Sequence, residues 1–209
     1  MPKAQTVAVE IQAPQLEVVT FPIKAIGKGY IAKAWSVDDR EKLKDKTRKV
    51  PLPTPEQQYE SARHKLTEPT EDGLTDGIPA AAFARAIVDA SYRCAKYKST
   101  QVRGMFTILT DYEDQWGCPC VPIIAPEPTP REDLVYNHSG VTVKPALSTR
   151  PWYPQWEAEL RIEVNANQIE SAKIGVLIQL AGAHIGVGSR RPEKEAGSNF
   201  GRFTLAGLQ

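Results

Sequence analysis

The sequence predicts an α+β fold, because its 209 residues contain strand-like and helix-like segments in the order strand, helices, three strands, helix and strand. Residues 16–26 (LEVVTFPIKAI) are rich in β-branched and aromatic side chains, which are typical of strands. Residues 80–96 are rich in alanine and carry apolar residues at helical spacing. Residues 156–164 alternate apolar and charged side chains, as a strand with one buried face does. At this length, a single domain over residues 1–209 is expected.

Two segments near the N-terminus are expected to lie outside the sheet. Residues 1–14 are small, polar and bounded by proline, which predicts a flexible N-terminal arm that orders on a neighbouring molecule. Residues 38–53 are dense in charge and end in Pro-Leu-Pro, which predicts an exposed loop insertion. Pro22 predicts that the first strand is an edge strand, or that it is bulged or broken. Residues 27–30 (GKGY) fit either a hairpin turn or a basic turn that binds a phosphate and a base.

A second helix is predicted to begin at Thr54. Thr54 is a favoured N-cap residue, Pro55 suits the first helical position, and Gln57 completes a capping box. The pattern predicts a helix that continues to near Pro69 and carries His64. A single helical histidine without a fixed partner is more often a polar surface residue than a general acid or base.

The middle of the chain combines strand signals with a long irregular stretch. Residues 102–110 (VRGMFTILT) predict a strand with a bulge at Gly104. Residues 111–137 hold many prolines and acids, which predicts a second loop insertion that Trp116 pins to the body. A loop of this length usually serves a function or an oligomer contact. Residues 141–147 predict another short strand.

The C-terminal segment begins with a predicted helix. Asn167 is expected to be its N-cap, and Glu170 completes a capping-box pattern. The helix is apolar nearly all round, which predicts that it is covered on more than one side. Gly182, Gly186 and Gly188 are expected to end it, because glycine adopts positive φ readily.

A glycine-rich basic loop follows this helix. Residues 189–199 (SRRPEKEAGSN) carry three cations and backbone amides that suit the binding of phosphates. Residues 200–203 (FGRF) predict a short strand. The alternative is a plain turn with solvated charges.

Residues 150–156 (RPWYPQW) are a second stretch that suggests nucleic-acid binding. Trp152 and Tyr153 could stack on exposed bases, with Arg150 on a phosphate. Trp156 is expected instead to open the alternating strand and to anchor it in the core.

The ending of the chain resembles a known family. The segment 186–188 (GVG), followed by 200–203 (FGRF) after an apolar helix, resembles the C-terminal glycine-rich loop of the RAMP superfamily. These proteins are ferredoxin-like RNA-binding subunits of CRISPR systems, and some polymerise along a guide RNA. The chain also resembles a group of uncharacterised phage and prophage proteins, through residues 77–80 (GIPA) and 150–156. The resemblance implies a ferredoxin-like or RRM-like βαββαβ sheet, with helices on one face and a loop insertion.

Composition and charge limit the class of protein. No apolar run is long enough for a membrane span, and residues 1–21 lack a signal-peptide pattern, so we expect a cytoplasmic protein of a bacterium or a phage-infected host. The net charge of +1 argues against a strongly basic binder. The charges lie in blocks, however: residues 24–49 hold nine cations and four acids, and residues 111–133 hold one cation and six acids. Such blocks predict one basic and one acidic face, or merely solvated loops.

The three cysteines do not predict a disulfide framework or a metal site. An odd count suits a reducing compartment. Only one residue separates Cys118 from Cys120, whereas zinc sites usually have two to four residues between thiols and need further ligands. His138 could serve as one more ligand, but no fourth ligand follows at a sensible spacing, so no metal is expected. No cofactor is expected either, because neither a P-loop nor a Rossmann pattern is present.

These patterns favour a non-catalytic protein that binds single-stranded DNA or RNA largely independently of sequence and assembles along the strand as a homo-oligomer. Its setting would be replication, recombination or a CRISPR-related process. The candidate nucleic-acid-binding residues are Lys28, Tyr30, Lys33, Arg150, Trp152, Tyr153, Arg190, Arg191, Lys194 and Arg202.

Two other function classes fit parts of the sequence. A RAMP-type metal-independent endoribonuclease would need a histidine near the glycine-rich loop, and His64 and His184 are the weak candidates. A structural or adaptor protein that acts through aromatic and proline-rich stretches fits the near-neutral charge, but does not explain the basic loop.

Overall fold

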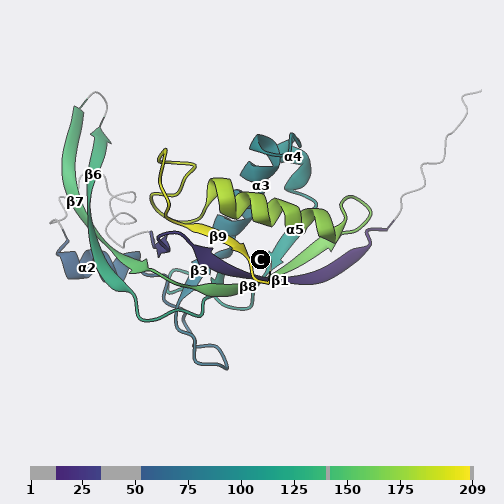
Figure 1. Ribbon diagram of the computed structural model, residues 1–209. Helices are drawn as coiled ribbons and strands as arrows, with labels where there is room; N and C mark the ends of the chain where they lie inside the picture. The colour runs from purple at the N-terminus through teal and green to yellow at the C-terminus, as the bar shows by residue number, and fades with distance from the viewer. Residues whose placement is uncertain (1–12, 34–52, 140–141, 208–209) are drawn as a thin grey trace, which may run out of the picture.

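A four-stranded antiparallel sheet lies at the centre of the fold (Figure 1). The computed structural model describes residues 13–33, 53–139 and 142–207. The sheet consists of β1 (Leu16–Ile26), β4 (Phe106–Leu109), β8 (Glu157–Asn165) and β9 (Arg202–Leu205), in the order β4-β8-β1-β9. Each neighbouring pair of strands is antiparallel.

Two helices, α3 (Ala80–Arg93) and α5 (Ser171–Leu180), cover one face of this sheet (Figure 1). Alternate side chains of β8 explain the packing: Ala158, Leu160, Ile162 and Val164 are buried, whereas most of the intervening charged residues are exposed. The chain order β1, α3, β4, β8, α5, β9 and the spatial strand order together define a ferredoxin-like βαββαβ sheet. This confirms the predicted fold class.

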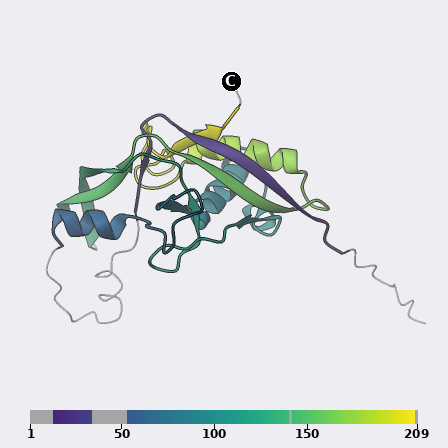
Figure 2. The same cartoon turned by 90° about the horizontal axis from the view of Figure 1, so that it is seen from below.

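Insertions into this plan build the rest of the structure. Between β1 and α3 lie β2 (Tyr30–Ile31), α2 (Pro55–Ala62) and β3 (Gly77–Pro79). The short helix α4 (Ser99–Val102) precedes β4, and β5 (Cys120–Pro122), β6 (Thr129–Ser139) and β7 (Thr142–Tyr153) follow it. The β6–β7 hairpin projects from the body and pairs with β2, and α2 lies near its base (Figures 1 and 2).

A cluster of five buried aromatic rings joins the inserted strands to the ferredoxin-like core. Trp156 contacts Tyr30, Phe83 and Phe203, with ring centroids 6.4, 6.1 and 6.1 Å away. Tyr30 also packs on Tyr153 at 5.7 Å. Such offset and edge contacts are favourable for aromatic pairs beyond the area that they bury. The prediction that Trp156 anchors the core is therefore confirmed.

The first strand has its predicted bounds, but the interpretation of Pro22 was wrong. β1 is a central strand between β8 and β9. Pro22 pairs with Glu159 on β8, and its carbonyl accepts a hydrogen bond from Ala206 N at 2.8 Å, just past the end of β9. Proline has no N–H to donate back to Ala206, and β9 ends at Leu205, so the missing hydrogen bond falls at the end of the β1–β9 ladder.

The capping box of α2 is present as predicted, with Gln57 N donating to Thr54 Oγ1 and Thr54 N donating to Gln57 Oε1. The helix ends at Ala62, however, and not near Pro69. His64 therefore lies just beyond the helix, where its side chain is buried.

Two predictions for the middle of the chain were wrong in part. Only residues 106–109 of the segment 102–110 form a strand, because α4 ends at Val102 and a turn at Gly104 follows it. The segment 111–137 contains β5 and most of β6, so much of it is paired and not loop. Its prolines are accommodated because β5 and β6 are short or outer strands of small sheets.

The helix α5 begins at Ser171 and has no side-chain cap, so the predicted N-cap at Asn167 was wrong. Asn167 instead donates its side-chain amide to Ala13 O, which fastens the start of the described chain. Val176 on this helix is 59% exposed, so the helix is covered less completely than its apolar sequence suggested.

Two predicted segments lie outside the described residues: the arm over residues 1–14, except its last two, and the loop over residues 38–53, except its last. Among the described residues, the structure contains no helix of the length and hydropathy that a membrane crossing requires.

Gly201 should be far less tolerant of substitution than Gly197, although both have positive φ (69° and 76°). A Cβ at Gly201 would lie 1.9 Å from the carbonyl oxygen of Val187, whereas a Cβ at Gly197 meets nothing within 4 Å. We expect Gly197→Ala to lower the free energy of unfolding by about 1 kcal/mol, and Gly201→Ala to lower it by at least about 2 kcal/mol more. Urea denaturation of both variants tests this, and equal losses would contradict it.

Candidate nucleic-acid interface

The glycine-rich turn after α5 is held by close backbone contacts. The π-helical turn η1 (Ala181–Ile185) leads into Gly186 and Gly188, which have φ of 73° and 76°. Val187 N donates to Gly201 O at 2.8 Å, and Ser189 N donates to Ile31 O at 3.0 Å. A Cβ at Gly188 would lie 2.4 Å from the ring of Tyr30. Glycine is therefore required here by the close approach of β2 as well as by φ.

A pocket of about 400 Å³ opens beside this turn, and we call it the glycine-loop pocket. Its walls come from residues 186–188 of the turn, from α3, and from the segments next to β2 and α2. The charged residues among its lining are three cations, Lys33, Arg85 and Arg191, and one acid, Asp89. His64 also lines it. The pocket thus has a surplus of positive charge beside glycine backbone, which suits a phosphate.

The three cations of the pocket differ in how far they are already neutralised. Arg191 donates to Gly188 O at 3.0 Å and pairs with Glu193 at 2.9 Å. Arg85 is 66% exposed in its side chain and lies 3.5 Å from Asp89. Lys33 is exposed and has no ion-pair partner within the described part of the chain. Lys33 and Arg85 are therefore the cations that are most available to a ligand.

The three cations of the basic loop, which the sequence suggested for phosphate binding, form ion pairs with acidic residues. Arg190 pairs with Asp133 and with Glu195, each at 2.7 Å, and Lys194 lies 3.5 Å from Glu193. Hydrogen bonding to Glu195 raises the pKa of Arg190 above its ordinary range. Asp133, from the acidic block 111–133, thus supplies a counter-ion to the basic loop, whereas most of the basic block 24–49 lies outside the described residues.

A second group of residues lies on the other part of the loop, and we call it the Phe200 cluster. The Phe200 ring has Arg131 at 4.8 Å and Lys28 and Arg190 each at 5.6 Å from its centroid. Arg131 also lies 5.8 Å from the Trp152 ring, whose Nε1 donates to Lys28 O at 2.7 Å. Lys28 and the half-buried Trp152, both candidate binding residues, therefore lie close together.

The other predicted binding residues are less available to a ligand. Arg150 donates to Ser189 Oγ at 2.8 Å, and burial lowers its pKa. Arg202 donates to Asn199 Oδ1 at 2.9 Å. Tyr30 and Tyr153 are each 1% exposed inside the aromatic core, so neither ring has a free face for a base. The expectation that these two tyrosines stack on bases was wrong for that reason.

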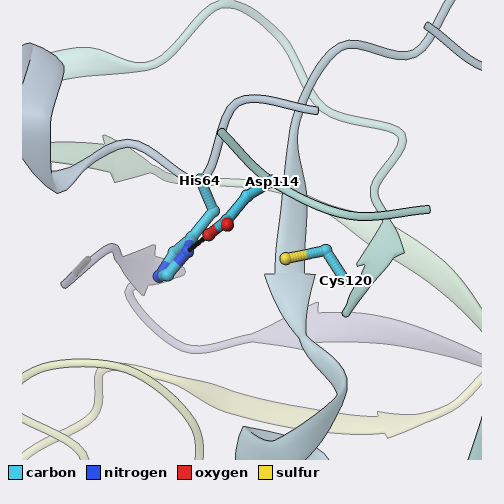
Figure 3. A group of neighbouring side chains, drawn as sticks. All are labelled: His64, Asp114 and Cys120. Carbon is cyan, nitrogen blue, oxygen red and sulfur yellow. Dashed lines mark hydrogen bonds and ion pairs between the residues drawn. The ribbon is translucent and has the colours of Figure 1, made fainter. Parts of the chain in front are cut away.

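His64 and Asp114 form a buried pair at the wall of the pocket (Figure 3). His64 Nδ1 lies 2.7 Å from Asp114 Oδ2, and the other oxygen of Asp114 accepts from the N–H groups of Trp116 and Cys118 at 2.9 and 3.0 Å. Burial alone would raise the pKa of Asp114, but these hydrogen bonds, led by that with His64, hold it below the ordinary value. The carboxylate is therefore ionised at neutral pH.

Cys120 completes this group, since ligand atoms of His64, Asp114 and Cys120 all lie within 4.8 Å of one another (Figure 3). Burial raises the pKa of the Cys120 thiol, and that of the neighbouring Cys118 thiol is also raised by burial. His184, the other histidine candidate, is exposed on η1 and does not line the pocket.

Sequence reasoning missed this buried group because its partners are distant in the chain. His64 and Asp114 are 50 residues apart, and neither lies in a spacing that a motif describes. The buried Arg63–Asp76 ion pair, at 2.6 Å, was missed for the same reason. Only the Cys-Pro-Cys motif gave a signal in the sequence. It was considered together with His138, whose side chain lies outside the described residues.

Comparison with known proteins gives a structural similarity but no sequence match. No protein-family model matches the chain, and no curated protein sequence matches it. Among solved structures, the crystal structure of Cmr6 from Pyrococcus furiosus is similar over 92% of this chain and 100% of that chain, with 14% identity and a TM-score of 0.39. A similarity at this level does not assign a function. The resemblance to phage and prophage proteins finds no support in these comparisons.

Asp114 should make the stability of the protein depend on acid pH. Because its pKa is lower in the folded state than the ordinary 3.8, its contribution is complete above that value and is lost as the pH falls through the folded pKa. We expect Asp114→Asn to lower the free energy of unfolding by about 1–3 kcal/mol at pH 6 and by much less at about pH 3. Urea denaturation at both pH values measures this.

Asp111→Asn is the matched control, since the Asp111 side chain is 85% exposed and lies 3.4 Å from Arg161 on the surface. It should change stability little at either pH. An equal loss for Asp114→Asn at both pH values would show that its carboxylate charge is not what stabilises the fold.

Proposed function

We propose that this protein is a non-catalytic binder of single-stranded nucleic acid that recognises the strand through its phosphates, largely independently of sequence. The observation that carries the proposal is the glycine-loop pocket, where three cations and one acid surround the positive-φ turn at residues 186–188. Cations beside glycine backbone bind phosphates without reading bases. The pocket volume of about 400 Å³ lies within the range of small-ligand sites.

The Phe200 cluster supports a second contact on the same loop. Trp152 is half-buried, and its indole N–H is already bonded to Lys28 O, so the ring is held in a fixed orientation. A fixed aromatic ring beside an exposed lysine can stack on a base while the lysine meets a phosphate. Stacking of this kind tolerates any base, which agrees with binding that is largely independent of sequence.

Assembly along the strand is part of the proposal. Leu134 and Leu147 face one another across the β6–β7 hairpin and are 56% and 58% exposed. This apolar pair lies on the hairpin that projects from the body (Figure 1). A projecting hairpin with exposed leucines would make contact with a second copy of the chain. Replication, recombination and CRISPR-related processes all use proteins of this kind.

Replacing the available pocket cations should weaken binding of single strands and flatten its salt dependence. Each phosphate that is no longer neutralised lowers the slope of log affinity against log salt by about 0.7 for single strands, so Lys33→Gln with Arg85→Gln should lower it by about 1.4. Fluorescence anisotropy with labelled single-stranded DNA and RNA at several salt concentrations measures both effects. Lys98→Gln, which removes an exposed lysine outside the pocket lining, is the control.

If the parent protein binds tightly and the double variant has the same slope of log affinity against log salt, the pocket is not part of the interface. No binding of single strands by the parent protein at low salt would overturn the proposed function. The variant Arg190→Ala is less informative, because it would leave the buried Asp133 with fewer partners.

The alternative of a metal-independent endoribonuclease has one observation in its favour, which is that His64 lines the pocket with the cations. Cleavage needs one group to remove a proton and another to donate one near neutral pH. Of the residues that line the pocket, His64 alone is of a type that titrates near neutrality. We therefore expect labelled RNA to stay intact with excess protein in a chelator, as judged by gel electrophoresis. Cleavage that His64→Ala abolishes would establish the enzyme instead.

A further inference from the structure

We propose that His64, Asp114 and Cys120 bind one zinc ion that fastens β5 and the segment before it to the end of α2. These residues come from two parts of the chain that are about fifty positions apart, and all three are buried (Figure 3). A bound ion would therefore join segments that otherwise meet through a few hydrogen bonds. Such a site goes beyond nucleic-acid binding and does not depend on it.

The geometry is close to what zinc requires. Zinc binds nitrogen and oxygen at about 2.0–2.2 Å and sulfur at about 2.3 Å, so the ligand atoms of a tetrahedral site lie roughly 3.3–3.8 Å apart. The ligand atoms of His64, Asp114 and Cys120 all lie within 4.8 Å of one another. The His64 Nδ1 to Asp114 Oδ2 distance is 2.7 Å because a proton bridges them, and the ion would replace this proton.

The carboxylate of Asp114 is already oriented as a metal ligand needs to be. One oxygen is held by the N–H groups of Trp116 and Cys118, so the other is presented to His64 and to the space beside Cys120. Fixed outer hydrogen bonds of this kind set the orientation of ligands in metal sites. The side chain of Asp114 is also fully buried, which keeps water from competing.

An imidazole, a carboxylate and a thiolate favour zinc over magnesium or calcium, which prefer oxygen ligands. In zinc sites with three protein ligands, a water molecule takes the fourth position.

The site borders the glycine-loop pocket through His64, and Cys120 pairs with Pro79 at the start of α3. An ion at this position would hold the imidazole in the pocket wall and keep it from acting as a free acid or base.

The test is metal binding by the full chain, with no nucleic acid present. Protein stripped with a chelator is titrated with zinc and analysed by elemental mass spectrometry, and a cobalt-loaded sample is examined by absorption spectroscopy. We expect one zinc per chain, a higher thermal midpoint with zinc, and a cobalt spectrum with intense tetrahedral bands and a sulfur-to-cobalt charge-transfer band. Folded parent protein that takes up no zinc, or cobalt without the sulfur band, would overturn the proposal.

Single substitutions assign the ligands. Cys120→Ser should lower zinc affinity by at least about 100-fold, since losing a ligand weakens a site more than losing an outer partner does. Cys94→Ser is the control, because Cys94 is an exposed free cysteine outside the group. Unchanged affinity in Cys120→Ser, or an equal loss in Cys94→Ser, would show that the thiol group proposed here does not bind the ion. Because metal is measured directly, failure here is distinct from failure of nucleic-acid binding.

Discussion

The packing of Trp156 against three other aromatic rings is the constraint on which the remaining structure depends. Its neighbours Tyr30, Phe83 and Phe203 belong to β2, α3 and β9, so one side chain joins the inserted strands to both layers of the ferredoxin-like core. Trp156 itself is 2% exposed. Because buried aromatic rings tolerate little displacement, the distance between α3 and the glycine-rich turn is set by this cluster. The glycine-loop pocket is the space that remains between them.

Close contacts with neighbouring atoms also restrict the conformation of the glycine-rich turn. Gly188 lies against the Tyr30 ring, and Gly201 lies against the backbone of Val187, so the turn is clamped from two sides. A clamped turn loses little conformational entropy when a ligand binds, which favours affinity. The cations near the turn differ in their roles. Arg190 and Arg191 hold the loop through ion pairs with acidic residues, whereas Lys33, which also lines the pocket, is left for a ligand.

Sequence patterns correctly predicted the parts of the fold that depend on interactions between residues close together in the chain. The bounds of β1, the capping box at Thr54 and the alternating strand after Trp156 each depend on side chains a few positions apart. The start of α5 was wrong because Asn167 bonds to Ala13, a residue far away in the sequence. The tyrosines at positions 30 and 153 were misassigned because a pattern of aromatics and cations does not say which rings face the core. The His64, Asp114 and Cys120 group depends entirely on contacts of this long-range kind.

The position of His64 connects the two proposals physically. It lies at the end of α2, its ring borders the pocket, and its Nδ1 faces Asp114 on the segment before β5. Whatever occupies the space between these side chains, a proton or a metal ion, fixes the imidazole and with it one wall of the pocket. A proton joins only the two hydrogen-bonded atoms, whereas an ion bound also by Cys120 would hold β5 and, through its pairing with β3, the start of α3. Metal loading would therefore be expected to change how rigidly the pocket is formed.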